Sequence, residues 1–277
     1  MAKKAQYSVV DSKESFEALL TRVRQAQQEF ARYSQERVDA IFKAAAMAAN
    51  QARIPLAKEA VAETGMGVVE DKVIKNHYAS EYIYNTYKNV KTCGVVEEDP
   101  AFGVKKLLEP VGVIGAVIPT TNPTSTVIYK SMICMKAGNP IIFSPHPSAV
   151  NCILETVNVV RRAAEGAGAP AGSISCITTP TLEATNALMR HDDTRLLLAT
   201  GGGAMVKAAY SSGTPAIGVG AGNGPAYIHH TADVRPAVKR LLDSKPFDHG
   251  TLCARAPSIG VERRLARSAA SGRGATG

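Results

Sequence analysis

Apolar residues in the first third of the chain recur at helical spacing. One amphipathic segment follows Ser12 and a second follows Ser34, and both serines are suited to cap a helix N-terminus. A third segment, 54–64, ends at Gly65, and residues 69–90 predict another helix. The apolar positions of the first two segments are Phe16, Leu19, Leu20, Val23, Val38, Ile41, Phe42, Ala45 and Ala46. Residues 1–100 are therefore predicted to form a helical N-terminal part.

From about Phe102 onward, short β-type runs alternate with helical ones. The runs that predict strands are 105–110, 111–118, 140–144, 173–177, 195–200 and 226–229. Those that predict helices are 124–137, 148–164, 181–189, 204–210 and 234–242. This alternation is typical of a doubly wound α/β domain with a parallel sheet, which we place at residues 101–246.

Composition narrows the class of protein. Apolar residues make up 45% and charged residues 20% of the chain, as in ordinary soluble globular proteins. The net charge is +8, but residues 254–277, with five Arg and one Glu, supply half of it, so we expect no nucleic-acid binding. Residues 263–277 are mainly Arg, Ala, Ser and Gly, which predicts a disordered tail.

The chain ends and the cysteines exclude several further classes. Residues 1–6 are polar and no apolar segment follows them, and the most apolar run, 111–119, is too short for a bilayer. We therefore expect no signal peptide, no membrane span and a cytoplasmic location. Five scattered cysteines without a C-x-x-C pair argue against disulfides or zinc. His229 and His230 would point to opposite faces of a strand, so we expect no metal site.

Two segments combine a strand end with a helix start, a position that suits a pyrophosphate or an oxyanion. The first is 119–126, where the amide of Asn122 could donate to a developing negative charge. The alternative is a proline-bracketed turn with Thr and Ser caps. The second is Gly201, Gly202 and Gly203, whose backbone could approach a ligand closely. The alternative there is a flexible connection.

Two later segments are also candidates. Residues 218–225 are glycine-rich, but Pro225 interrupts them and no helix follows directly, so we interpret them as a loop lining a site rather than a dinucleotide fingerprint. In 247–254, Cys253 lies in a polar loop, where a thiol could serve as a nucleophile or could be structural. His249 is four residues away, a spacing that does not establish contact with the thiol.

Together these segments resemble the aldehyde dehydrogenase superfamily, and within it the CoA-acylating branch found in the N-terminal half of bifunctional aldehyde–alcohol dehydrogenases. The resemblance spans about residues 14–262. The stretches that carry it are 52–85, 119–126 (PTTNPTST), 141–149 (IIFSPHPSA), 205–225 and 247–254 (FDHGTLCA). It implies that 101–246 binds NAD and that 247–262 holds the nucleophile and begins a catalytic domain.

The resemblance also implies a reaction. The thiolate of Cys253 attacks acetaldehyde or another short aldehyde, Asn122 and the backbone N–H of Cys253 stabilise the oxyanion, NAD accepts a hydride, and CoA takes the acyl group reversibly. The cofactor-side residues it implies are Pro119, Thr120, Thr121, His146, Pro147, Gly201, Gly202, Gly203, Gly220 and Gly222. His146 stands where hydrolytic members carry a lysine. Members of the family form homo-oligomers.

Two departures from the family refine this interpretation. Hydrolytic members have a general-base Glu near 218–228, whereas no acidic residue lies between Ser211 and His230, which favours transfer to CoA over hydrolysis. After Cys253 the family usually reads Ala-Ser-Glu-Gln-Ser, whereas this chain reads Ala-Arg-Ala-Pro-Ser, and by Arg263 the likeness ends. This favours a truncated or frame-shifted chain, so the alternative function is a catalytically incomplete NAD-binding fragment.

Overall fold

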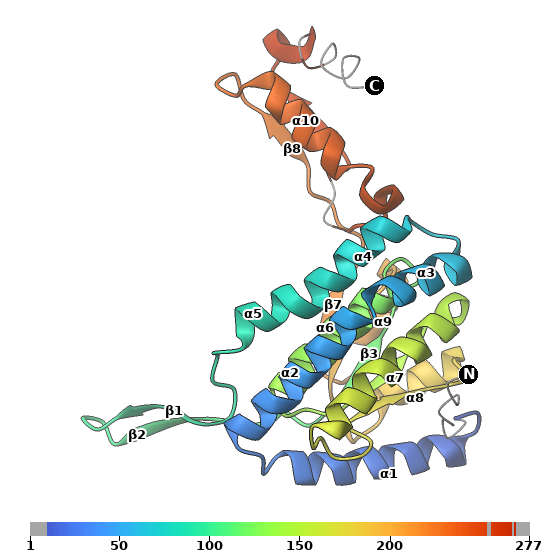
Figure 1. Ribbon diagram of the computed structural model, residues 1–277, viewed down its shortest axis with the longest axis vertical. Helices are drawn as coiled ribbons and strands as arrows, with labels where there is room; N and C mark the ends of the chain where they lie inside the picture. Colours follow the sequence, from blue (N-terminus) through green and yellow to red (C-terminus); the bar gives the residue numbers. More distant parts are fainter. Residues whose placement is uncertain (1–9, 254–255, 268, 270–277) are drawn as a thin grey trace.

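Five parallel strands form the central sheet of the protein (Figure 1). The structure, a computed structural model, describes residues 10–253, 256–267 and 269. The strands are β3 (Val113–Val117), β4 (Ile141–Ser144), β5 (Ile174–Cys176), β6 (Thr194–Thr200) and β7 (Ala216–Val219), in the spatial order β5-β4-β3-β6-β7. The chain runs from the centre to one edge, returns beside β3 and continues to the other edge. The predicted doubly wound sheet is confirmed, with its switch point between β3 and β6.

Helices cover both faces of this sheet. On one face lie α6 (Pro123–Lys136) and α7 (Val150–Gly166), which pack against α2 (Gln35–Gln51). On the other lie α1 (Lys13–Phe30), α8 (Leu182–Arg190) and α9 (Gly203–Tyr210). All residues of β3 are buried, and their alternation divides them between the two faces. This two-sided burial explains why the predicted strands are continuous apolar runs.

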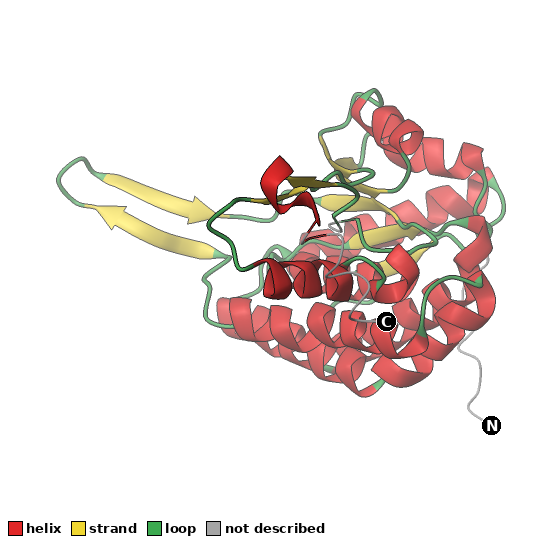
Figure 2. Ribbon diagram, turned by 90° about the horizontal axis from the view of Figure 1, so that it is seen from above, coloured by secondary structure: helices red, strands yellow, loops and turns green. Residues whose placement is uncertain are grey.

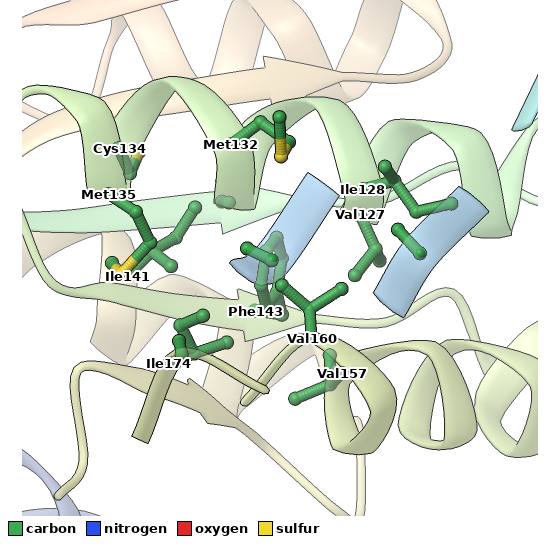
Figure 3. Packing of buried hydrophobic residues seen from close by; sticks show 14 of the residues in the cluster. Val127, Ile128, Met132, Cys134, Met135, Ile141, Phe143, Val157, Val160 and Ile174 are labelled. Carbon is green, nitrogen blue, oxygen red and sulfur yellow. The ribbon is translucent and has the colours of Figure 1, made fainter. Parts of the chain in front are cut away.

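The larger of the two interfaces is formed by α2, α6 and α7. Figure 3 shows Phe143 of β4 surrounded by Ile128 and Met132 of α6 and by Val157 and Val160 of α7. These side chains are fully buried. The loops at the carboxyl edge of the sheet therefore start from strands that are held by a closely packed core.

The N-terminal helices agree with the prediction, with one irregularity. In addition to α1 and α2 they comprise α3 (Arg53–Thr64), α4 (Val69–His77) and α5 (Ile83–Tyr87). A π-helical turn, Tyr78–Tyr82, interrupts the single helix expected over 69–90. The hydroxyl of Ser12 caps α1, whereas Ser34 precedes α2 without a side-chain capping bond. Gly65 ends α3 in the left-handed conformation, at φ 66°.

Two parts of the chain project from this body. The antiparallel hairpin β1 (Gly94–Asp99) and β2 (Val104–Leu108) extends away from the helices (Figures 1 and 2). The second projection is the C-terminal arm, by which we mean the described residues from Ala226 to Ala269. It contains β8 (Ala226–Ile228), α10 (Val234–Ser244) and β9 (Ile259–Val261), and β8 pairs with β9 in parallel.

The arm corrects two expectations. The strand over 226–229 belongs to a separate two-stranded sheet, and the fifth strand of the main sheet is β7, at the start of the glycine-rich segment. The tail was expected to be disordered from residue 263, yet Arg263–Leu265 form a 3-10 turn and Ala269 is buried in a cluster with Val238. Residues 268 and 270–277 lie outside the described residues. Among the helices that the structure describes, none is both long and apolar enough to cross a bilayer.

Candidate active site

A cavity of about 760 Å³ opens at the carboxyl edge of the sheet. Its walls are the loops that follow β3, β4, β6 and β7, the start of α8 and the loop that carries Cys253. Ligands of doubly wound folds bind at this edge because the crossovers separate at the switch point and leave a crevice. The predicted residues that line it are Pro119, Thr120, Thr121, Asn122, His146, Pro147, Gly201, Gly202, Gly220, Gly222 and Cys253.

Gly203 is the exception among the predicted residues. It is the first residue of α9 and is not part of the cavity lining, whereas the preceding Gly201 and Gly202 are. The glycine segment thus divides at the helix start. Its cavity-lining part is Gly201 and Gly202, and Gly203 belongs to the helix.

The sequence analysis did not predict one wall of the cavity. Pro180, Thr181 and Leu182 at the start of α8 line the cavity, and Thr181 caps α8 by accepting a hydrogen bond from the Ala184 N–H. They follow β5, which ends at the same edge as the other parallel strands. That shared edge is the signal that could have found them, because every strand-to-helix loop of the sheet opens there.

The loop after β7 touches the cysteine loop directly. A Cβ atom placed on Gly222 would lie 1.6 Å from the carbonyl oxygen of Cys253, so a side chain at this position would force the two loops apart. By contrast, a Cβ atom on Gly202 would meet no atom within 4 Å. Gly222 therefore permits a close contact between loops, while Gly202 faces open space that a ligand can occupy.

The five cysteines, all within the described residues, differ in accessibility. Cys253 is exposed, whereas Cys134, Cys152 and Cys176 are buried. Burial raises the pKa of the Cys134 thiol to about 12, and it also raises the pKa of Cys152 and Cys176. A buried neutral thiol is unreactive because the thiolate is the nucleophile. Cys253 is thus the accessible thiol of the cavity.

Asp248 connects the cysteine loop to α4. Its carboxylate is wholly buried and accepts hydrogen bonds from the Val68 N–H at 2.7 Å and from the Lys72 ammonium at 3.0 Å. It also accepts from the hydroxyl of Thr251, at 2.6 Å, and from Lys75. Because these partners lie in two separate parts of the chain, the carboxylate fixes the loop on the body.

The charges of this cluster compensate one another. Burial raises the pKa of Asp248, but hydrogen bonds from Lys75 and Thr251 outweigh it and hold that pKa below its usual range. Burial lowers the pKa of Lys75, and the carboxylate of Asp248 partly restores it. One carboxylate therefore pairs with two nearby ammonium groups, Lys72 and Lys75.

The backbone of the cysteine loop adopts an unusual conformation. Asp248 and His249 have φ values of 51° and 50°, and Gly250 follows at 73°. Positive φ in a residue with a side chain is costly and persists only where the surroundings enforce it. The buried bonds of Asp248 supply that enforcement. In the part of the chain that the structure describes, no hydrogen bond joins His249 to Cys253.

Asn122 is held from both sides. Its Oδ1 accepts a hydrogen bond from Lys75 at 2.7 Å, and its Nδ2 donates to the carbonyl oxygen of Thr251 at 2.9 Å. An ammonium group is donor only, so Lys75 fixes which end of the amide is oxygen. The NH₂ end of Asn122 is thereby directed toward the cysteine loop. Lys72, Lys75 and Asp248 were not among the predicted site residues.

The family follows from comparison with known proteins. A profile described as "Aldehyde dehydrogenase family" matches residues 4–271. The chain belongs to the aldehyde dehydrogenase family. The expected resemblance is confirmed.

The curated relatives of this chain include two aldehyde-alcohol dehydrogenases. The bifunctional aldehyde-alcohol dehydrogenase AdhE of Escherichia coli K12 is 59% identical over 244 residues, which cover 88% of this chain and 27% of that protein. The aldehyde-alcohol dehydrogenase of Clostridium acetobutylicum is 51% identical over 243 residues, 88% of this chain and 28% of the other. The chain thus spans about a quarter of their length.

Solved aldehyde dehydrogenase structures share the fold. An acetylating aldehyde dehydrogenase from Geobacillus thermoglucosidasius is 45% identical with a TM-score of 0.93, over 95% of this chain and 58% of that one. A propionaldehyde dehydrogenase from Rhodopseudomonas palustris, with bound CoA and an acylated cysteine, is 31% identical with a TM-score of 0.86, over 99% and 61%. The chain spans about three fifths of these proteins.

Proposed function

We propose that the cavity oxidises acetaldehyde or another short aldehyde to an acyl thioester and transfers the acyl group to CoA, reversibly. The observation that carries the proposal is the placement of an accessible thiol, Cys253, in the wall of a cavity that also holds Asn122 and the starts of α6, α8 and α9. A nucleophile and an anion-stabilising group in one crevice are the parts that acyl chemistry needs.

The residues of the chain divide this work. The Cys253 thiolate adds to the aldehyde carbon and forms a thiohemiacetal, whose oxyanion the NH₂ group of Asn122 and the Cys253 N–H stabilise. Lys75 orients the Asn122 amide by donating to its oxygen. Asp248 neutralises Lys75 and holds the cysteine loop against α4. Loss of hydride then leaves an acyl thioester on the sulfur.

The residues present fit NAD as the acceptor. Gly202 faces open space beside the N-terminus of α9, and such helix starts attract phosphate groups. Gly201, Gly202, Gly220, His146 and Pro147 would hold the cofactor. NAD, when bound, accepts the hydride.

The residues around the thiol favour release to CoA. No acidic residue lies between Ser211 and His230, so this segment offers no carboxylate to activate water for hydrolysis. The thiol of CoA is a stronger nucleophile than water and needs less help. The reverse direction, from acyl-CoA to aldehyde, would reoxidise NADH in fermentation, and we expect a homo-oligomer as in related enzymes.

A second function, NAD binding without turnover, is favoured by the C-terminal arm. Cys253 is exposed, and the arm to which it belongs presents exposed apolar side chains, among them Tyr227 and Ile259. A cavity that remains open on this side would bind the cofactor yet hold the aldehyde poorly.

One experiment separates the two functions. NADH formation is followed with acetaldehyde and NAD, with and without CoA, for the chain and for Cys253→Ala. CoA-dependent NADH that disappears in Cys253→Ala supports the acylating reaction. No NADH from a folded chain that binds NAD supports the second function, and equal rates in both proteins would remove Cys253 from the mechanism.

A further inference from the structure

Two histidines and a glutamate converge at the outer end of the C-terminal arm. β8 ends at Ile228, so His229 and His230 lie beyond the strand, and the expectation that they point to opposite faces is wrong. Ile228 pairs with Val261, which places the histidines beside Glu262. Their ligand atoms and that of Glu262 all lie within 4.8 Å of one another.

The distances match the edges of a metal coordination shell. Nδ1 of His230 lies 3.0 Å from Oε1 of Glu262, and Nε2 of His229 lies 3.6 Å from the same oxygen. Tetrahedral zinc with ligands at about 2.1 Å has ligand–ligand edges of about 3.4 Å. Both distances are close to that edge, so a cation can enter with small side-chain adjustments.

A neighbouring hydroxyl fixes one of the ligands. Oγ1 of Thr231 lies 2.9 Å from Nδ1 of His229, the ring nitrogen that does not face the carboxylate. The backbone N–H of Thr231 also lies 3.4 Å from this nitrogen, so Thr231 holds the ring through two groups and leaves Nε2 on the side of the carboxylate. Metal-bound histidines are usually held in this way through the second nitrogen.

The second carboxylate oxygen is also held in place. Nε of Arg264 donates to Oε2 of Glu262 at 3.2 Å, and Oε1 accepts from the backbone N–H of His230 at 3.0 Å and from the hydroxyl of Tyr227 at 3.3 Å. The three side chains remain accessible, with 49%, 42% and 23% of His229, His230 and Glu262 exposed. A cation can therefore reach the cluster from solvent and keep a water as a further ligand.

We propose that His229, His230 and Glu262 form a binding site for a divalent transition-metal ion of the zinc class. Imidazole nitrogens and a carboxylate are a ligand set for such ions rather than for Ca²⁺ or Mg²⁺, which prefer oxygen ligands. The ion would bridge the ends of β8 and β9. This pair has only three residue pairs, and two-stranded sheets are weak alone, so the bridge would stabilise the arm.

The test uses Zn²⁺ and Co²⁺ as probes on the full chain, in a Cys253→Ser background that removes the exposed thiol. We expect calorimetry to give one Zn²⁺ per chain, and Co²⁺ to give the visible absorption of a low-coordinate site. His230→Gln and Glu262→Gln should abolish binding or weaken it at least about tenfold, and Thr231→Val should weaken it about tenfold with all three ligands retained.

A matched control separates this site from ordinary His–Glu pairs. His77 lies 3.5 Å from Glu81 in an exposed pair of the same chemistry but with a single histidine. His77→Gln should leave the zinc affinity unchanged. Absence of binding to the parent chain, or equal binding by the His230→Gln and His77→Gln variants, would overturn the proposal. Neither outcome bears on the aldehyde reaction, because the site does not include the cavity.

Discussion

The sheet and the C-terminal arm differ in how they are held. In β3 every residue is buried, and the cluster around it joins α2, α6 and α7. In β8 only Ile228 is buried, and the arm's cluster has three buried members, Ile228, Val238 and Ala269. Burial of apolar area is the main stabilising contribution, so the two regions must differ greatly in local stability.

The two sides of the cavity differ in a similar way: the loops proposed to bind the cofactor are attached differently from the loop proposed to carry the nucleophile. On the proposed cofactor side of the cavity, the loops after β3 and β4 follow strands in which every residue is buried. The proposed nucleophile belongs to a loop whose main attachment to the body is polar, through Asp248 and its partners on α4. Cofactor binding should therefore tolerate changes that the cysteine loop does not.

Asp248→Ala should have the largest effect. Removing one partner of a buried ion pair leaves uncompensated charge and costs about 3–5 kcal/mol. We expect the variant to destabilise the cysteine loop in particular. Amide hydrogen exchange around residues 247–253 and alkylation of Cys253 should both become faster. Exchange in β3 and β4 should be unchanged.

A comparable pair in the body is the control for this variant. Lys136, a buried lysine on α6, pairs with the carboxylate of Asp39 on α2. Asp39→Ala should destabilise the helices without altering exchange in the cysteine loop. If Asp248→Ala accelerates neither amide exchange around residues 247–253 nor alkylation of Cys253 relative to this control, the polar attachment is unimportant.

Asn122→Ala tests the proposed oxyanion donor next to the cysteine loop. Loss of one oxyanion donor should lower the rate of Cys253 acylation by about 10²-fold, while NAD affinity stays the same. Single-turnover NADH formation and NAD titration measure the two quantities. An unchanged acylation rate would remove Asn122 from the oxyanion site, whatever the state of the loop.

Lys75→Met should have a smaller effect of the same kind. Without the donor to its oxygen, the Asn122 amide can rotate, and loss of a charge-assisted hydrogen bond corresponds to about tenfold in rate. We expect kcat to fall with KM little changed, since the contact acts in the transition state. Lys75→Arg should restore much of the rate. Equal rates for the two variants would leave Lys75 a structural residue only.

The periodicity of apolar residues predicted the sheet and its helices well, but it predicted none of the contacts of the cysteine loop. The helices and most strands of the sheet were found because each buries a regular apolar face over several residues. β7 was missed because it is short, contains Gly218 and is at most half-buried, and β1 was missed because it is largely exposed and ends in three acidic residues. The family resemblance identified Cys253 and Asn122 as candidates.

The Asp248 cluster could not be found in that way. The carboxylate and Val68 are 180 residues apart, and neither the charge pattern of α4 nor the loop sequence indicates that they meet. The convergence of His229 and His230 on Glu262 depended on where β8 stops. A one-residue error in a strand end reverses the direction of a side chain, and strand ends are the least predictable feature of a sequence.

Lys130 shows that a polar group is also buried at a cost in the body of the protein. Its ammonium is buried beside the switch point and donates to the carbonyl oxygens of Val117 and Leu198, at 2.9 and 2.6 Å. Burial lowers its pKa from 10.5 to about 7. Between these pH values the unfolded chain binds a proton that the folded chain lacks, so stability rises with pH, by at most about 1.4 kcal/mol per pH unit.

Lys130→Met should remove that dependence. Below pH 7 both states of the wild-type chain are protonated at Lys130 and the difference from the variant is constant, whereas from pH 7 to 9 the wild type should gain stability relative to Lys130→Met. The measurement is urea unfolding of both proteins at several pH values. The slope is decisive rather than the absolute value, because the variant also leaves two carbonyl groups without a donor. Parallel pH profiles would show that the lysine is charged in the fold, and that the two carbonyl dipoles compensate for its burial.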